Sequence, residues 1–314
     1  MPPVVLLFPG QGSQAPGMGR DLAERFPAAR AVFDSADAVL GVPLSRLCFD
    51  GPEEELTRTL NAQPALLTHG AAVWAVLRQT LGSSVVAAAG HSLGEFTAYH
   101  AAGALSLEDA VRLVRTRGEL MYEAGQQRPG AMAAILGDLS EPVEALCARA
   151  TADAGVVVPA NFNCPGQVVV SGEPAGVERL MVLAREHGAR RAIRLNVSGA
   201  FHSPLLNDAA AGLQSALALA TLRQPSFPVY ANVNAQPIED VDVARRLLVE
   251  QLTAPVQWAR EVEAIVTRYP DALYVELGPG AVLKGLVRKI APAVTVLTCG
   301  TAAEVETVLT RVAA

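Results

Sequence analysis

The pentapeptide Gly90-His91-Ser92-Leu93-Gly94 is the stretch whose residue types and spacing point most directly to chemistry. It follows a short run of β-formers and alanine and precedes a helix-like segment. A Gly-x-Ser-x-Gly motif at a strand-to-helix turn is typical of a nucleophile elbow, which lifts the serine hydroxyl clear of the sheet. The alternative is an ordinary glycine-rich turn whose serine only caps the helix. The strand before and the helix after favour the elbow, so we interpret Ser92 as a nucleophile.

A serine nucleophile needs a base at neutral pH, and histidine is the usual one. His202 lies in a loop that follows a strand, where such a base is commonly found, and we assign it this role. His91 adjoins Ser92 but is expected to project away from it and to act only through other groups. The remaining histidines are expected within helices: His69, His100 and His187. No acidic partner for the base stands out, since Asp208, Glu276 or a carbonyl group could each orient an imidazole.

Arg117 interrupts the apolar face of a helix predicted from Ser106 to about Glu123. It has helical spacing from Leu113 and from Met121, which belong to that face. A guanidinium on a buried face must find an anion because it keeps its charge. A salt bridge to a core carboxylate and a fork for the carboxylate of a ligand both meet this need. The neighbouring sequence does not decide between them.

An oxyanion hole requires backbone N–H donors close to the nucleophile. Leu93, the residue after the serine, is the usual first donor. The glycine-rich loop at residues 9–19 offers further N–H groups, and Gln11 is the second candidate. This loop lacks the lysine of a P-loop and the glycine spacing of a dinucleotide site, so no nucleotide site is predicted. The residues alone therefore indicate a serine acyl-transfer enzyme, hydrolase or transferase, for acids that carry a second carboxylate.

Strand and helix patterns alternate along most of the chain, which predicts an α/β fold with a mostly parallel sheet covered on both faces. The strands expected in this region are 4–8, 85–89, 229–233, 272–277 and 295–299. The expected helices are 21–38 with a break at Pro27, 65–81 with Pro64 in its first turn, 93–102, 205–220, a helix that follows the 278–280 turn and reaches 290, and 302–312.

The pattern changes between residues 130 and 197. A strand at 131–136 is followed by a helix at 141–150, strands at 156–160 and 167–171, a helix at 175–187 and a last strand at 191–197. This β-α-β-β-α-β order is that of a ferredoxin-like unit. We therefore expect a discontinuous catalytic domain, residues 1–129 and 198–314, with an inserted ferredoxin-like subdomain at 130–197.

Composition excludes several classes of protein. The 314 residues are 51% hydrophobic, enough for a large core, and the formal net charge is −6. This acidic balance and the lack of a basic run argue against nucleic acid as a partner. No apolar stretch is long enough to span a bilayer, and the N-terminus lacks the basic region of a signal peptide. The four cysteines form no C-x-x-C pair, so we expect reduced thiols, no metal site and a cytoplasmic protein.

Several motifs together resemble the malonyl-CoA:acyl-carrier-protein transacylase family, in order and over nearly the whole chain. They are Phe8-Pro9-Gly10-Gln11-Gly12-Ser13-Gln14, Gln63-Pro64-Ala65-Leu66, Gly90-His91-Ser92-Leu93-Gly94-Glu95, Arg117-Gly118, Asn161-Phe162-Asn163, Pro165-Gly166-Gln167, Phe201-His202-Ser203-Pro204, Gln251-Leu252, Pro255-Val256-Gln257-Trp258 and Gly278-Pro279-Gly280. The resemblance implies an α/β-hydrolase-like large domain with a ferredoxin-like insert.

The resemblance also implies a ping-pong reaction. Ser92 takes malonyl from coenzyme A as an ester, and the phosphopantetheine thiol of acyl carrier protein then collects it. His202 would be the base, the main-chain carbonyl of Gln251 would orient it, and Arg117 would pair with the malonyl carboxylate. The predicted substrate-binding residues are Gln11, Gln63, Leu93, Arg117, Met121 and Phe201. No bound cofactor is expected, coenzyme A enters only as a thioester substrate, and the protein is expected to be a monomer.

Phe201 bears on selectivity. In related polyketide acyltransferase domains a Phe before the active-site His accompanies malonyl and a Ser accompanies methylmalonyl, whereas many fatty-acid enzymes carry a small or polar residue there. The pathway therefore stays open between fatty-acid and polyketide synthesis. Two clusters could receive an acidic carrier protein: Arg190, Arg191 and Arg194, and Lys284, Arg288 and Lys289. The alternatives are a serine hydrolase acting on carrier-bound acyl groups and a docking subunit with a decayed site.

Overall fold

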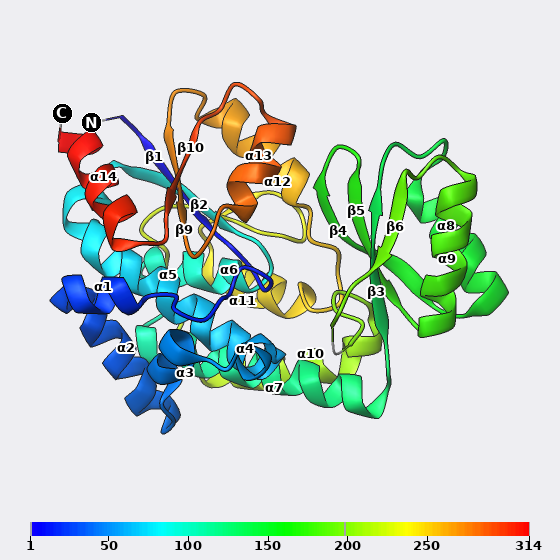
Figure 1. Cartoon of the computed structure of the whole chain (residues 1–314), viewed down its shortest axis with the longest axis horizontal. Helices are drawn as coiled ribbons and strands as arrows, with labels where there is room; N and C mark the ends of the chain where they lie inside the picture. Colours follow the sequence, from blue (N-terminus) through cyan, green and yellow to red (C-terminus); the bar gives the residue numbers. More distant parts are fainter. Residues whose placement is uncertain (1, 198, 314) are drawn as a thin grey trace.

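The computed structural model of this chain describes residues 2–197 and 199–313, which form two β-sheets with surrounding helices (Figure 1). The described residues do not include Met1, Ser198 and Ala314, which are end residues of the expected segments 1–129 and 198–314. The larger sheet has six strands in the order β10-β9-β1-β2-β7-β8. Its strands are β1 (Val4–Phe8), β2 (Val85–Gly90), β7 (Val229–Tyr230), β8 (Pro237–Ile238), β9 (Leu273–Leu277) and β10 (Val296–Cys299).

Neighbouring strands of the larger sheet are parallel, except that β8 runs antiparallel to β7. Successive residues of a strand point to opposite faces. In β1, Val4, Leu6 and Phe8 enter one hydrophobic core, whereas Val5 and Leu7 enter another. Both faces are therefore buried, which is why this strand is a continuous apolar run. The prediction of a mostly parallel sheet covered on both faces is confirmed.

Helices cover the two faces unequally (Figure 1). The first core receives side chains from α1 (Arg20–Arg25), α2 (Pro27–Leu40), α3 (Leu44–Asp50), α4 (Glu53–Thr57), α5 (Thr59–Leu81), α6 (Leu93–Ala101), α7 (Leu107–Gln127), α10 (Asn207–Leu219), α11 (Val241–Glu250) and α14 (Ala302–Ala313). The second receives them from α12 (Trp258–Arg268) and α13 (Val282–Ile290). Short 3₁₀ turns precede β2 (η1, Gly82–Ser84) and α10 (η2, Pro204–Leu206). None of the helices in the described part of the chain has the length and apolar character that crossing a membrane needs.

The long helix α5 starts earlier than predicted. It begins at Thr59, so Pro64 lies inside it and not in its first turn. Proline cannot donate to the carbonyl four residues earlier, which here belongs to Leu60. The guanidinium of Arg115 on α7 donates to that carbonyl over 3.1 Å. The helix can continue through the proline because a neighbouring helix replaces the bond that the proline cannot make.

The smaller sheet is built from residues 131–194 and lies at the right of Figure 1. Its strands are β3 (Ala131–Leu136), β4 (Val157–Cys164), β5 (Gln167–Gly172) and β6 (Arg191–Arg194). They are antiparallel throughout, in the order β4-β5-β3-β6, and α8 (Val143–Ala154) and α9 (Pro174–Glu186) pack on the sheet through a separate core. The element order agrees with the predicted one, but β6 ends at Arg194 and not at Val197.

A backbone bridge ties the smaller sheet to the larger part of the molecule. Val256, just before α12, donates its N–H to the Ala160 carbonyl and accepts from the Phe162 N–H, each over 2.9 Å. Because α12 covers the larger sheet and β4 belongs to the smaller one, this bridge fixes the distance between the two.

The strand predicted at 229–233 is only two residues long in the structure. The chain turns directly after it, since the Ala231 N–H bonds to the Gln236 carbonyl over 3.0 Å and β8 runs back beside β7. The Asn232 N–H is directed to the carboxylate of Glu95 and not to a strand. The sequence patterns also gave no sign of α3, α4, α11, α12 and β8.

Candidate active site

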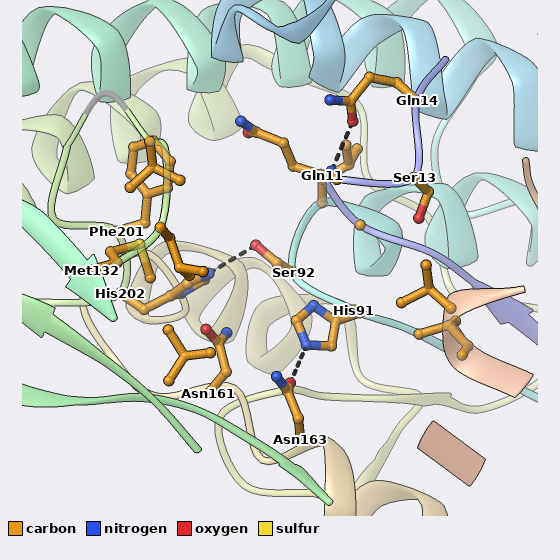
Figure 2. A pocket seen from close by; sticks show the side chains of 18 of the residues that line it. Gln11, Ser13, Gln14, His91, Ser92, Met132, Asn161, Asn163, Phe201 and His202 are labelled. Atoms are coloured by element: carbon orange, nitrogen blue, oxygen red, sulfur yellow. Dashed lines mark hydrogen bonds between the residues drawn. The ribbon is translucent and has the colours of Figure 1, made fainter. Parts of the chain in front are cut away.

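Ser92 occupies the tight turn between β2 and α6 (Figure 2). Its backbone angles, φ 52° and ψ −108°, lie outside the regions that L-residues favour, and such a conformation costs about 1–3 kcal/mol. A Cβ on Gly90 would lie 1.9 Å from the carbonyl carbon of Gly94, and a Cβ on Gly94 would lie 2.1 Å from the Phe8 carbonyl oxygen. Both glycines are therefore required. The Ser92 side chain makes no capping bond to α6, so the capping alternative does not describe this turn.

His202 faces Ser92 from the loop before η2, with its Nε2 2.8 Å from Ser92 Oγ (Figure 2). Its Nδ1 lies 2.8 Å from the main-chain carbonyl oxygen of Gln251. A carbonyl can only accept a hydrogen bond, so Nδ1 carries the proton and Nε2 is free to accept one from the serine. Neither Asp208 nor Glu276 takes this place: Glu276 accepts bonds from the N–H groups of Leu283 and Lys284 at the start of α13.

The imidazole of His202 is held in its neutral form. Its exposed fraction is 4%, and burial followed by the nearby charge of Arg117 lowers its pKa from 6.5 to about 3. His202 also has a positive φ of 56°. Of the described non-glycine residues, only Ser92, His202 and Ala235 have a positive φ, so backbone strain is concentrated where the two reacting groups meet.

Arg117 is buried, with 1% of its surface exposed, and lies beside the nucleophile. Its guanidinium donates to Ser92 Oγ over 3.0 Å, to Gln63 Oε1 over 2.7 Å and to the Gln251 side-chain oxygen over 2.9 Å. Burial lowers its pKa to about 10, and the charge of Glu95 opposes this shift, so the group stays charged at neutral pH. Among the described residues no carboxylate lies within ion-pair distance of it. The structure therefore does not contain the core salt bridge that was one of the two alternatives.

A cavity of about 400 Å³ opens over these groups, between the two sheets. One side is formed by the loop at residues 10–14, the elbow and α7, and the other by β3, β4 and β5. The lining residues contributed by these strands are Met132, Asn161, Asn163, Gln167 and Val169. Residues 195–197, which were predicted as strand, line the cavity instead, as do Val282, Leu283 and Leu286 of α13.

The structure brings most of the predicted site residues to this cavity. Its lining includes Gln11, Ser92, Leu93, Arg117, Met121, Phe201 and His202. Gln63 and Gln251 lie behind it: Gln63 bonds to Arg117 and donates to the Met121 sulfur over 3.2 Å. His91, which was expected to project away from Ser92, has its Nε2 2.8 Å from Asn163 Oδ1 (Figure 2) and also contributes to the cavity lining.

Two backbone N–H groups are available beside the nucleophile. Within the described residues, neither the Leu93 nor the Gln11 N–H has a hydrogen-bond acceptor. Leu93 begins α6, where the first N–H groups have no partner within the helix. The Gln11 side chain is anchored on Thr59 Oγ1 at 3.2 Å. This arrangement suits a developing negative charge on an oxygen.

A buried polar network behind the elbow was not predicted. It contains Glu95, Asn232 and Glu261, each with at most 1% of its surface exposed. Burial raises the pKa of Glu95 to about 7 and that of Glu261 well above its ordinary value. Glu95 stands in the quoted elbow motif, so its position was a usable signal; no local pattern pointed to Asn232 or Glu261. In the described part of the chain no group of acidic, cysteine or histidine side chains is arranged to hold a metal ion, and the four cysteines are buried free thiols.

Comparison with known proteins places this chain among acyltransferases. The family model described as "Acyl transferase domain" matches residues 5–304. The malonyl CoA-acyl carrier protein transacylase of Bacillus subtilis is 46% identical over 290 residues, 92% of this chain and 91% of that protein. The acyl-carrier-protein S-malonyltransferase of Bartonella henselae has a TM-score of 0.94 and 41% identity, covering 99% of this chain and 100% of that one. A malonyl-transacylase solved in complex with its type II polyketide synthase acyl-carrier protein has a TM-score of 0.93 and 39% identity, covering 98% and 99%. The chain belongs to the malonyl-CoA:acyl-carrier-protein transacylase family of acyl transferase domains.

Proposed function

We propose that this protein transfers malonyl from malonyl-CoA to the phosphopantetheine thiol of an acyl carrier protein. One observation carries the choice of acyl group: a buried, charged Arg117 donates to the nucleophile oxygen over 3.0 Å and has no carboxylate partner among the described residues. A guanidinium in this position fits an acyl chain that ends in a free carboxylate. The names of the relatives, malonyl CoA-acyl carrier protein transacylase and S-malonyltransferase, support the same substrate.

In the first half-reaction, His202 Nε2 takes the proton from Ser92 Oγ as the oxygen attacks the thioester carbonyl. The negative charge that develops on the carbonyl oxygen is stabilised by the N–H groups of Leu93 and Gln11. The carbon–sulfur bond then breaks, and the imidazolium returns its proton to the leaving thiolate of coenzyme A. Because the Gln251 carbonyl holds Nδ1–H throughout, the other ring nitrogen stays directed at the reacting atoms.

The second half-reaction reverses these roles. The carrier thiol gives its proton to His202, the sulfur attacks the malonyl ester carbon, and the Ser92 oxygen leaves and recovers the proton. No step uses a metal or a bound cofactor.

The division into domains, the oligomeric state and the localisation of the protein are proposals as well. The strand order β4-β5-β3-β6 supports a ferredoxin-like subdomain at residues 130–197. The elbow at the end of β2 supports an α/β-hydrolase-like catalytic domain made of residues 1–129 and 198–314. We also propose a monomeric cytoplasmic enzyme, in fatty-acid or polyketide synthesis.

The helix α13 carries three exposed basic residues, Lys284, Arg288 and Lys289, and other residues of this helix line the cavity. We propose this face of α13 as the landing area for the acidic carrier protein.

Intact-protein mass spectrometry would test the proposed function. The wild type and Ser92→Ala are incubated briefly with malonyl-CoA, methylmalonyl-CoA and acetyl-CoA in competition, without acceptor. We expect a malonyl adduct on the wild type alone, which a holo carrier protein removes faster than water does. Rapid release of free malonate without an adduct would favour the alternative, a serine acyl hydrolase, and neither adduct nor turnover would favour a docking subunit with a decayed site.

A further inference from the structure

Asn232, at the turn after β7, is fully buried and uses every one of its polar groups. Its Oδ1 accepts from the Ser92 N–H over 2.8 Å and from Gln251 Nε2 over 3.2 Å. Its Nδ2 donates to the Gly90 carbonyl over 2.7 Å and to both carboxylate oxygens of Glu261, over 3.0 and 3.2 Å. The backbone N–H of Asn232 donates to Glu95, and its carbonyl accepts from the Gln257 N–H over 2.8 Å.

The surrounding groups fix which way the Asn232 amide points. Arg117 can only donate, so it determines that Gln251 Oε1 faces it and that Gln251 Nε2 faces Asn232. The oxygen of Asn232 must then face this donor and the Ser92 N–H. A reversed amide would set its NH₂ against two donors and its oxygen against the Gly90 carbonyl.

These contacts hold the strained residue of the elbow from both sides. The Ser92 N–H is bound by Asn232, and the Ser92 carbonyl accepts from Gln251 Nε2 over 3.0 Å. Gly90, at the other end of the turn, is bound by the same Asn232 side chain. A single amide therefore joins the last residue of β2 to the serine and leaves the next N–H, that of Leu93, without an acceptor among the described residues.

We propose that Asn232 is a positioning residue for the nucleophile: its side-chain amide, oriented by Gln251 and Glu261, holds the Ser92 peptide so that Oγ meets His202 and the Leu93 N–H faces the oxyanion. The inference rests on the proposed role of Ser92 as nucleophile, but not on malonyl as the acyl group. Without the amide, the turn loses its bonds to the Ser92 N–H and the Gly90 carbonyl. The strained backbone is then free to relax, and a displacement of about 1 Å at a reacting atom costs roughly 100-fold in rate.

The test compares Asn232→Ala, Asn232→Asp and a matched control, Asn234→Ala. Asn234 is the same residue type in the same turn, but it is exposed, and its side chain has one hydrogen bond among the described residues, from the Gln236 N–H over 3.0 Å. Two rates are measured for each folded protein: single-turnover acylation by malonyl-CoA and labelling of Ser92 by a fluorophosphonate. Circular dichroism gives the folded fraction, to which the rates are normalised.

We expect Asn232→Ala to slow both reactions by about 100-fold. The KM for malonyl-CoA and the preference for malonyl over acetyl should stay within about threefold of the wild type, because Gln63 and Gln251 still hold Arg117. Asn232→Asp keeps the acceptor for the Ser92 N–H but loses the donors to Gly90 and Glu261, so it should give an intermediate rate. If Asn232→Ala does not fold, slower acylation and slower labelling of Asn232→Asp, with an unchanged KM for malonyl-CoA, would support the proposal.

Wild-type rates in the folded Asn232 variants would overturn the inference, as would a loss of rate that disappears once the rates are normalised to the folded fraction. An equal loss in Asn234→Ala would also overturn it. A wild type that reacts with the fluorophosphonate but not with malonyl-CoA would refute the proposed acyl group only, and the labelling rates would still decide the role of Asn232.

Discussion

Replacing Arg117 should abolish the preference for malonyl over acetyl while leaving acetyl transfer almost unchanged. We compare Arg117→Ala and Arg117→Met, the second of which fills most of the space of the removed side chain. Arg112→Ala is the matched control, because Arg112 lies on the same helix and carries the same charge but is exposed.

The magnitude follows from the contacts of Arg117. Removing one partner of a buried ion pair costs about 3–5 kcal/mol. In the free protein the guanidinium already bonds to Gln63, Ser92 and Gln251, so a malonyl carboxylate replaces at least one such bond, worth about 1 kcal/mol. The difference, about 2–4 kcal/mol, corresponds to a loss of roughly 30- to 700-fold in kcat/KM for malonyl-CoA. The acetyl group of acetyl-CoA has no carboxylate that could bond to Arg117, so kcat/KM for acetyl-CoA should stay within about threefold of the wild-type value.

The assay is a competition between equal concentrations of malonyl-CoA and acetyl-CoA, quenched while only a small part of the protein is acylated. The ratio of the two adducts by intact mass gives the ratio of kcat/KM values directly. Unchanged selectivity in both Arg117 variants would refute the carboxylate fork. An equal slowing of both thioesters would show that Arg117 acts on Ser92 or on the fold and does not select the acyl group.

Three further predictions follow from the same cavity. His202 has a pKa lowered to about 3, so its imidazole remains a neutral base well below pH 6.5. We therefore expect kcat/KM for acylation to stay level from pH 8 down to about 5. A pH–rate profile that falls on the acidic side with its midpoint at 6.5 or above would contradict this. Phe201 is buried and lines the cavity beside His202, so Phe201→Ser should raise the proportion of methylmalonyl adduct in the competition assay. It should also lower Tm, because emptying a buried aromatic site costs about 3–5 kcal/mol of folding free energy. An unchanged adduct ratio would show that another wall limits the acyl group. Reversing charge with Lys284→Glu and Arg288→Glu should raise KM for the carrier protein several-fold and leave KM for malonyl-CoA unchanged. Equal changes of the two KM values in steady-state kinetics would argue against α13 as the landing area.

The parts of the fold that sequence predicts well are those where burial leaves a regular pattern. β1 and β2 are apolar on both faces of the sheet, and α7 carries a clear apolar face with Arg117 in it. The start of α5 was missed because proline usually marks a first turn, and nothing in the local sequence shows that Arg115 would take up the Leu60 carbonyl. The strand predicted around β7 was too long, because the bonds that hold Asn232 outside the sheet come from Glu95 and Gln257, far away in the chain.

The site followed a similar rule. The Gly-x-Ser-x-Gly turn gives Ser92 a local signature, and the resemblance supplied Gln251 as the carbonyl partner of the base. Asn232 and Glu261 have no such signature, because an amide or a carboxylate becomes informative only when its partners are known. Their partners lie on β2, α6 and the 251–257 segment, and only the folded chain brings these together.

The division of the cavity between two sheets bears on how such enzymes diversify. Ser92, His202 and Arg117, with the groups that hold them, all belong to segments outside residues 130–197. Met132, Asn161 and Val169 on the opposite wall belong to the smaller sheet, which has its own core and contributes no proton-transfer group. Substitutions that accumulate in the smaller sheet can reshape what the cavity admits while the catalytic geometry stays intact. This wall of the cavity and the groups that transfer protons are therefore encoded by separate segments of the chain.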